Sequence, residues 1–251
     1  MANLQIKRKL AEGKPVTVVG GHPTNSNMVD FLGQFGFDGI WIECEHGPVT
    51  WDQIGDLSRA CDLWNAASIV RIPTSEPWII TRTLDQGASG IIVPHISNAA
   101  EARRVAEAAK FAPLGHRGIY TGCRRSFGVD DYFNHTNEET LVGILIEEAE
   151  AIKNLDEILQ VPNIDVFSVA PNDLAQSMGH VGDWRHPEVM GAIEQAIGQI
   201  VDAGKTAGFL AEEAEIQRYY DMGVRWFHSL WPRWVAASAR RFLGSVASVA
   251  G

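Results

Sequence analysis

Short apolar runs alternate with helical patterns along the whole chain, and this order is the strongest constraint on its fold. Eight runs have the length and the β-branched or aromatic content of strands buried on both faces. They span residues 16–21, 39–43, 67–72, 90–96, 141–147, 165–170, 206–210 and 226–230. Helical patterns lie between and after them at 25–35, 51–63, 76–86, 98–111, 148–159, 187–203, 214–222 and 234–249. Strands that alternate with helices form parallel βαβ units, so the chain is predicted to be an α/β protein.

The length of the chain favours closure of these units into one barrel. Its 251 residues are close to the roughly 250 typical of a (β/α)₈ barrel, so residues 1–251 are predicted to form a single domain of this kind. A doubly wound open sheet is the alternative, but no GxGxxG motif follows the first predicted strand. In a barrel the C-terminal ends of the strands meet at one rim, where enzymes of this fold place their active sites. Polar residues just beyond the strand ends are therefore the first candidates for chemistry.

Composition disfavours several classes of partner. The net charge of −10 opposes binding to nucleic acid or to an anionic membrane. The three cysteines are widely spaced and form no CxxC pair, which indicates neither a disulfide framework nor a zinc site. No apolar run approaches the roughly 20 residues that span a bilayer, and the charged start of the chain does not resemble a signal peptide. We therefore predict a cytoplasmic protein that acts on a small molecule.

Two acidic residues follow neighbouring predicted strands. Glu147 ends the fifth strand, and Asp173 lies just beyond the sixth. Adjacent parallel strands bring such side chains together at the rim, and paired carboxylates either share a proton or bind a hard divalent cation. Taken singly, each residue is an ordinary acid at a helix start, stabilised by the helix dipole. The pair predicts a site for Mg²⁺ or Mn²⁺, with Co²⁺ as an alternative.

A histidine and an arginine follow the second and third predicted strands. His46 can titrate near neutrality and can take a proton from a hydroxyl, although many loop histidines have no such role. Arg71 presents five donors in a planar fork, which suits a carboxylate or a developing oxyanion. The alternative for Arg71 is an internal ion pair with Glu43. Glu43 and Glu45 are expected to point to opposite sides of an extended segment, one of them into the barrel.

The remaining features are assigned structural or interface roles. The connection 113–140 is longer than a usual loop and is predicted to be functional or to cover the rim. The tail from 226 to 242 carries five large aromatic residues and is predicted to pack against another subunit. The histidines without metal-ligand spacing are interpreted as structural or rim residues: His22, His95, His116, His180 and His228.

Ordered motifs along the chain resemble the HpcH/HpaI family of metal-dependent class II aldolases. They lie at 36–48 (GFDGIWIECEHGP), 70–73 (VRIP), 84–94 (LDQGASGIIVP), 115–118 (GHRG), 146–155 (IEEAEAIKNL) and 170–179 (APNDLAQSMG). The resemblance extends from about residue 6 to about residue 242. Its specificity comes from the order of these motifs over almost the whole chain, because each motif alone is a weak signal.

The resemblance implies a fold, an assembly and a reaction. The family has a (β/α)₈ barrel and is commonly hexameric, with the last helix exchanged between subunits. Its members reversibly cleave 4-hydroxy-2-oxo acids into an aldehyde and pyruvate, or a related 2-oxo acid such as hydroxypyruvate. By motif, Glu147 and Asp173 match the metal ligands, His46 matches the general base, and Arg71 matches an arginine that contacts substrate in the transition state.

Three further positions matter to this resemblance. Asp85 matches the acid that raises the basicity of the histidine, yet the predicted third helix ends there, at the opposite rim. Either the predicted helix is misplaced or Asp85 acts across a subunit boundary. Asn172 matches the position whose backbone meets the substrate, but the family usually has alanine there. Leu145 stands where the family usually has a glutamine that contacts substrate.

The expected mechanism is a lyase reaction through an enolate that a metal ion at Glu147 and Asp173 stabilises. His46 removes the proton of the C4 hydroxyl, and Arg71 stabilises the charge that develops on oxygen. Two alternatives stay open. One is decarboxylation of oxaloacetate-like acids through the same enolate, and the other is non-catalytic binding of 2-oxo acids, with Leu145 as a sign of lost turnover.

Overall fold

Eight parallel strands form a closed barrel in the computed structural model, which describes residues 2–250 and the side chains of residues 4–249. The strands are β1 (Val16–Gly20), β2 (Gly39–Glu43), β3 (Ala67–Arg71), β4 (Gly90–Val93), β5 (Leu141–Ile146), β6 (Val166–Val169), β7 (Ala207–Leu210) and β8 (Trp226–Leu230). Each strand pairs in parallel with the next, and β8 pairs with β1 to close the ring. Every strand lies within a predicted run, so the predicted parallel barrel is confirmed.

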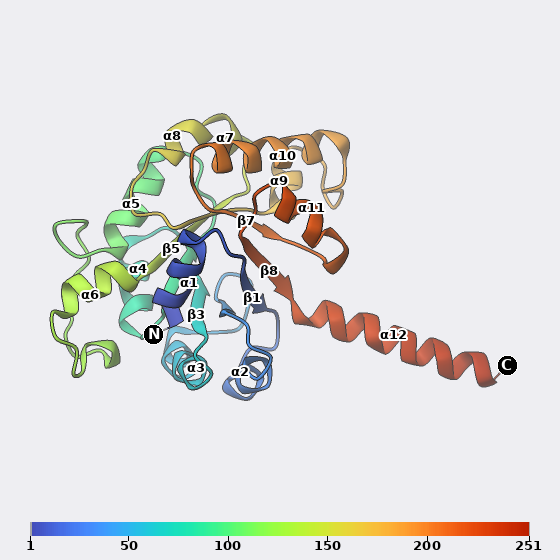
Figure 1. Ribbon diagram of the computed structural model, residues 1–251, viewed down its shortest axis with the longest axis horizontal. Helices are drawn as coiled ribbons and strands as arrows, with labels where there is room; N and C mark the ends of the chain where they lie inside the picture. Colours follow the sequence, from blue (N-terminus) through green and yellow to red (C-terminus); the bar gives the residue numbers. More distant parts are fainter. Residues whose placement is uncertain (1, 251) are drawn as a thin grey trace.

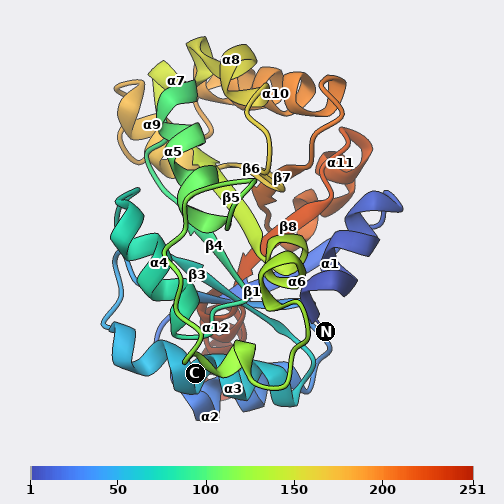
Figure 2. The ribbon, with the colours of Figure 1, turned by 90° about the vertical axis from the view of Figure 1, so that its left-hand side faces the viewer.

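Most of the helices surround the barrel on its outer face, whereas the last helix extends away from it (Figure 1, Figure 2). The helices are α1 (Ala2–Ala11), α2 (Ser26–Gly33), α3 (Trp51–Leu63), α4 (Pro77–Asp85), α5 (Ala99–Ala109), α6 (Tyr132–Glu139), α7 (Ala149–Lys153), α8 (Leu155–Leu159), α9 (Pro171–Ser177), α10 (Pro187–Asp202), α11 (Ile216–Asp221) and α12 (Trp231–Ala250), with 3₁₀ turns η1 (Arg124–Ser126) and η2 (Glu213–Glu215). Local chemistry fixes several starts. Asn25 and Asn98 accept hydrogen bonds from backbone N–H groups in the first turns of α2 and α5. Pro187 occupies the first turn of α10.

The helices depart from the sequence prediction in four places, one of which is helix α9, directly after β6, where no helix was predicted. Helix α1 was not predicted, and it covers the N-terminal end of the barrel, where Ile6 is fully buried. Helix α6 lies within the long connection 113–140. The predicted helix 148–159 is two short helices, α7 and α8, because Asn154 between them leaves helical geometry and its side chain donates a hydrogen bond to Ser97 O (2.9 Å).

The fourth strand ends earlier than predicted, and the reason lies in two residues. Pro94 follows β4 and has no N–H to donate to a neighbouring strand. His95 then adopts a φ of 55°, which ends the extended conformation that was predicted as far as residue 96. The backbone therefore turns at the C-terminal rim of the barrel, and the N–H of His95 is freed for another partner.

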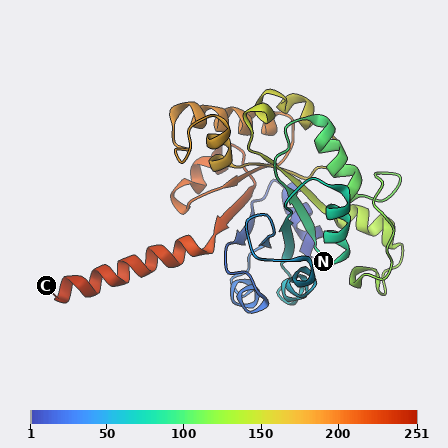
Figure 3. The same cartoon turned by 180° about the vertical axis from the view of Figure 1, so that it is seen from behind.

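The last helix extends away from the barrel (Figure 1, Figure 3). Beyond its first turns its large apolar side chains are exposed, with Phe242 at 69% and Leu243 at 64%. The predicted aromatic cluster of the tail is divided, because Trp226 lies inside the barrel and Trp234 stacks on Phe37 at a ring distance of 5.9 Å. No helix among the described residues has the length and apolar content needed to cross a membrane.

Candidate active site

A cavity of about 590 Å³ opens at the C-terminal ends of the strands. Its walls come from β2, β3 and β5 to β8 and from the loops and helices that follow them. Four of the predicted site residues line it: His46, Arg71, Asn172 and Asp173. The strand order therefore brings residues that are distant in sequence to one cavity, at the rim where a barrel enzyme performs its chemistry.

The two predicted metal ligands follow neighbouring strands. Glu147 comes directly after β5 and is only 1% exposed, whereas Asp173 lies in the first turn of α9, just beyond β6. Glu147 Oε1 accepts a hydrogen bond from the backbone N–H of His95 (2.8 Å). Its other oxygen, Oε2, is buried and has no hydrogen-bond partner in the described part of the chain. Burial raises the pKa of Glu147 to about 7, and the charge of Asp173 adds to this effect.

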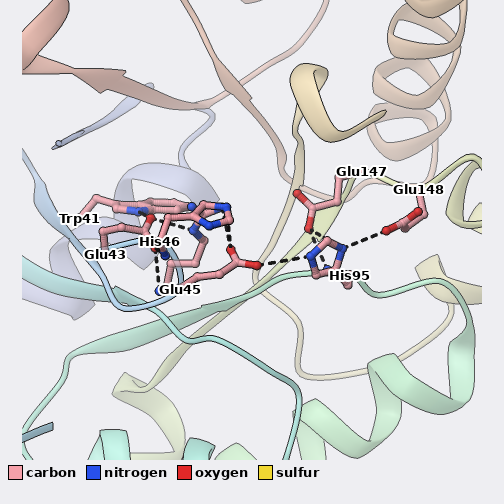
Figure 4. Close-up of polar contacts among 8 residues, drawn as sticks. Trp41, Glu43, Glu45, His46, His95, Glu147 and Glu148 are labelled. Atoms are coloured by element: carbon pink, nitrogen blue, oxygen red, sulfur yellow. Dashed lines mark hydrogen bonds and ion pairs between the residues drawn. The ribbon is translucent and has the colours of Figure 1, made fainter. Parts of the chain in front are cut away.

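His95 stands among these acids, although it was predicted to be a structural or rim residue (Figure 4). Its ring Nδ1 lies 2.9 Å from Glu148 Oε1, and its Nε2 lies 3.3 Å from Glu45 Oε1. Burial opposes protonation of the ring, but the hydrogen bond to Glu148 and the surrounding carboxylates outweigh it and raise the pKa of His95. The sequence held a usable signal, because His95 follows β4 at the same rim as the other candidates.

Arg71 is held by two glutamates. Its Nε donates to Glu43 Oε2 (2.7 Å), and its Nη1 lies 2.9 Å from Glu45 Oε2. Trp41 Nε1 also donates to Glu43 Oε2 (3.1 Å). Although burial opposes it, the positive charge of Arg71 keeps the pKa of Glu43 below its usual value. The alternative of an ion pair with Glu43 is thus present in a residue that also faces the cavity.

The prediction that Glu43 and Glu45 point to opposite sides was wrong. The strand ends at Glu43, and the chain then turns back, so that the backbone N–H groups of Glu45 and His46 donate to Glu43 Oε1 at 2.8 and 3.1 Å. Both carboxylates consequently meet Arg71. His46 follows this turn with a side chain that is 68% exposed, and its Nε2 lies 3.9 Å from Glu45 Oε2 (Figure 4).

Asp85 lies far from the other candidates within one chain. It ends α4, which leads into the N-terminal end of β4, so it belongs to the opposite rim from His46. Its Oδ1 accepts a hydrogen bond from Arg117 Nη2 (2.7 Å), and Arg117 is 5% exposed. The predicted helix was therefore placed correctly, and the described chain does not bring Asp85 and His46 together.

A second cavity, of about 340 Å³, lies between α3, α4 and the connection 113–140. It is lined by three arginines, but each has an acidic partner. Arg124 and Arg125 pair with Asp62, and Arg117 pairs with Asp85. The arginines of this second cavity are already paired with acids, whereas Asp173 of the first cavity has no lysine or arginine partner among the described residues, so we take the first cavity as the candidate active site.

The floor of the active-site cavity is largely apolar. Leu145 on β5 and Leu210 on β7 line it, and Leu145 packs within the apolar interior of the barrel. His228 on β8 also lines it, in contrast to the structural or rim role predicted for this residue. Its ring stacks on Trp41 at a distance of 4.1 Å and an angle of 10°. An apolar floor with one imidazole contrasts with the charged rim above it.

These groups permit a defined set of chemical steps. Within the described residues, neither Glu147 nor Asp173 has a lysine or arginine partner, so the two carboxylates suit a hard divalent cation. Arg71 can stabilise negative charge on a substrate oxygen, and the exposed His46 can exchange a proton with a bound molecule.

Comparisons with known proteins point to one family. The profile of the HpcH/HpaI aldolase/citrate lyase family matches residues 22–223. A hydroxypyruvate/pyruvate aldolase of Roseobacter denitrificans is 33% identical over 87% of each chain. A 4-hydroxy-2-oxo-heptane-1,7-dioate aldolase of Klebsiella pneumoniae is 36% identical, over 88% of this chain and 85% of the relative. The crystal structure of an HpcH/HpaI aldolase/citrate lyase family protein from Burkholderia cenocepacia is 28% identical and superposes with a TM-score of 0.91, over 97% of this chain and 99% of that one.

Proposed function

Because the chain belongs to the HpcH/HpaI aldolase/citrate lyase family and is a lyase of the class II pyruvate aldolase type, we propose that it reversibly cleaves 4-hydroxy-2-oxo acids. The products are an aldehyde and pyruvate or a related 2-oxo acid such as hydroxypyruvate. The observation that carries this proposal is the buried carboxylate of Glu147, whose Oε2 lacks a partner among the described residues, beside Asp173 at the rim. Such an arrangement is costly unless something positive completes it.

The residues at this rim fit a divalent metal ion. Members of the family are metal-dependent, and the citrate lyase β subunit of Mycobacterium tuberculosis was crystallised with oxaloacetate and magnesium. Glu147 and Asp173 offer carboxylate oxygens, the donors that Mg²⁺ and Mn²⁺ prefer. When bound, the ion would supply a Lewis acid that takes up negative charge from the 2-oxo group. Mg²⁺ or Mn²⁺ is our assignment, with Co²⁺ as an alternative.

The other residues at the rim orient the substrate and move its proton. Arg71 stabilises charge on the substrate oxygen, and Glu43 and Glu45 fix its guanidinium in the cavity. His46 removes the proton of the C4 hydroxyl, and its exposed ring allows that proton to pass to solvent. The backbone at Asn172 meets the substrate carboxylate. The C3–C4 bond then breaks, the C4 fragment leaves as the aldehyde, and C3 is reprotonated to give the 2-oxo acid.

An assembly of identical subunits, a hexamer by family resemblance, completes this proposal. The exposed apolar residues of α12 are consistent with a helix that packs on, or is exchanged with, a neighbouring copy. Asp85 lies at the opposite rim from His46 of its own chain, so its proposed effect on a histidine requires a neighbouring subunit. The ion pair with Arg117 would orient Asp85 for that role.

Exchange of pyruvate methyl protons in deuterated water tests the proposal without knowledge of the aldehyde. Enzyme supplied with Mg²⁺ or Mn²⁺ should exchange these protons, and an excess of chelator should abolish the exchange until metal is restored. Exchange that persists in chelator would contradict the metal role, and absence of exchange with every metal would leave a non-catalytic binding protein. A parallel assay of oxaloacetate loss against aldehyde-plus-pyruvate condensation separates decarboxylation from aldol chemistry.

A further inference from the structure

We propose that His228 makes this enzyme selective for 2-oxo acids that carry a hydroxyl group on C3, the hydroxypyruvate type, over pyruvate. The inference rests on the proposed function and adds a donor class to it. His228 is a specificity-determining residue in this proposal, and it takes no part in proton transfer. Its role follows from its place in the cavity, its missing hydrogen bonds and its charge state.

The ring of His228 is held in a fixed position at the wall of the cavity. His228 lies on β8, is 8% exposed and lines the active-site cavity together with Leu210 of the adjacent β7. The stacked indole of Trp41 fixes one face of the imidazole, at 4.1 Å and 10°. A ring held in this way presents its edge in a constant direction, which is a requirement for selective recognition.

One ring nitrogen of His228 lacks a hydrogen-bond partner among the described residues. His228 Nε2 is buried and makes no hydrogen bond to any described residue. The carboxylate of Glu43, whose charge acts on the ring, is already engaged, because it accepts hydrogen bonds from both Arg71 and Trp41. A buried ring nitrogen without a partner is unfavourable in a native protein. A substrate group in the cavity can supply the partner that the chain does not.

The ring of His228 is uncharged near pH 7. Burial lowers the pKa of His228 to about 3, and the charges of Arg71 and Arg233 act in the same direction. The imidazole is therefore neutral near pH 7 and offers one donor and one acceptor. A hydroxyl group, which also donates and accepts, matches this edge, whereas a substrate carboxylate is better served by the guanidinium of Arg71. The preferred partner is therefore a neutral hydroxyl.

The strand order indicates that His228 would meet C3 of the donor. The proposed metal ligands follow β5 and β6, so an ion held there would bind the carboxylate and 2-oxo oxygens of a donor on that side of the cavity. β8 is separated from β5 by β6 and β7, so His228 borders the other side of the cavity, where C3 of a donor bound in this way would lie. Leu145, in place of the usual glutamine, can make no hydrogen bond on the β5 side. Among the cavity-lining side chains of β5 to β8, only Ser168 and His228 are polar.

Proton exchange at C3 tests the inference for both donors in one format. The wild-type enzyme, with Mn²⁺ in deuterated water, should exchange the C3 protons of hydroxypyruvate with a higher kcat/KM than the methyl protons of pyruvate. His228→Leu should lower the ratio of these two kcat/KM values at least about tenfold, because a lost hydrogen bond to a substrate hydroxyl acts on that substrate alone. His228→Gln, which keeps a donor and an acceptor, should retain most of the preference.

The controls separate this inference from the function on which it rests. His116→Leu makes the same change at a side chain that is 84% exposed and should leave the ratio unchanged. Circular dichroism and the pyruvate exchange rate report whether His228→Leu is folded, and His228→Gln gives a second reading if it is not. Equal preference in wild type and both variants, with exchange intact, would overturn the role of His228 alone. No exchange of either acid by the wild type would overturn the proposed function and this inference together.

Discussion

The two sides of the active-site cavity are built on opposite principles. On the side of β2 to β5, Arg71 and Glu43 line the cavity and belong to a network of charged groups that continues beside it, in which Arg71 also meets Glu45, and His95 bridges Glu45 and Glu148. On the side of β7 and β8, the lining includes Leu210, Leu230 and the ring of His228, whose Nε2 has no hydrogen-bond partner among the described residues. The charged groups proposed to carry out the reaction are therefore held in fixed positions on one side, whereas the other side has a polar atom, His228 Nε2, that no described residue engages and that we assign to substrate recognition.

The largest effect should follow from removing charge at the metal site. Glu147→Gln and Asp173→Asn each remove a carboxylate that would bind the ion, and each should lower the metal-dependent exchange rate by ~10³-fold or more. The matched control is Glu148→Gln, which makes the same change one residue along at a half-buried side chain and should cost far less. A Glu147→Gln enzyme with an unchanged rate would show that the charged side of the cavity does not hold the ion.

The next effect concerns the arginine of the same side. Arg71→Lys keeps the positive charge but cannot contact both glutamates and a substrate oxygen at once, so kcat should fall by roughly 10²-fold with the fold retained. Steady-state kinetics and thermal unfolding together measure this. Arg59→Lys, at an exposed position on α3, is the control. A fall in kcat that equals the control's would reduce Arg71 to a structural ion pair.

A smaller effect is expected at His95. His95→Asn removes the ring contacts to Glu45 and Glu148 but tolerates the positive φ, so the backbone N–H can still donate to Glu147. Affinity for Mn²⁺ should fall about 10-fold, as for other residues that orient metal ligands without binding the ion. Titration calorimetry of Mn²⁺ measures the change, with His116→Asn, at a side chain that is 84% exposed, as the control. An unchanged affinity would place His95 outside the metal-binding network.

The other side of the cavity should respond to acid through stability. His228 has its pKa lowered to about 3 in the folded chain, against 6.5 for a free histidine. Its stabilising contribution is complete above the unfolded pKa and is lost as pH falls towards the folded value, because the unfolded chain then binds the extra proton. Between pH 7 and about pH 5 this loss is roughly 2 kcal/mol.

His228→Phe should lack this component of acid sensitivity. Its free energy of unfolding, measured by denaturant titration, should decline less than that of the wild type over the same pH range. Parallel decline of the two proteins would mean that the pKa of His228 is not lowered in the folded chain, which would contradict the burial of a neutral ring at this position.

Much of the fold could be predicted because it depends on local patterns. The strands of a parallel barrel are continuous apolar runs, and all eight were found from this property. The boundaries were less accurate where a single residue decides them, as at Pro94 and at Asn154. Helix α1 escaped prediction because it is held by contacts to the end of the barrel, such as buried Ile6, rather than by a strong pattern of its own.

The site was predicted unevenly, and strand position explains why. His46, Arg71, Asn172 and Asp173 line one cavity because they follow strand ends, where sequence position alone carries spatial information. His95 also follows a strand end, but it was predicted to be a structural or rim residue, because no other potential metal ligand lies near it at a suitable spacing in the sequence. The edge of His228 depends on its stacking with Trp41, a contact between strands far apart in sequence that no pattern along the chain contains.

Trp41 contacts both sides of the cavity, so a redesign of one side will disturb the other. Its indole donates to the glutamate that anchors Arg71, while its face supports His228. A substitution that widens donor choice by moving the imidazole will also shift the indole, and with it the guanidinium used in turnover. Altered selectivity and preserved rate should therefore show epistasis, and compensating changes will be needed at this tryptophan before either property can be tuned alone.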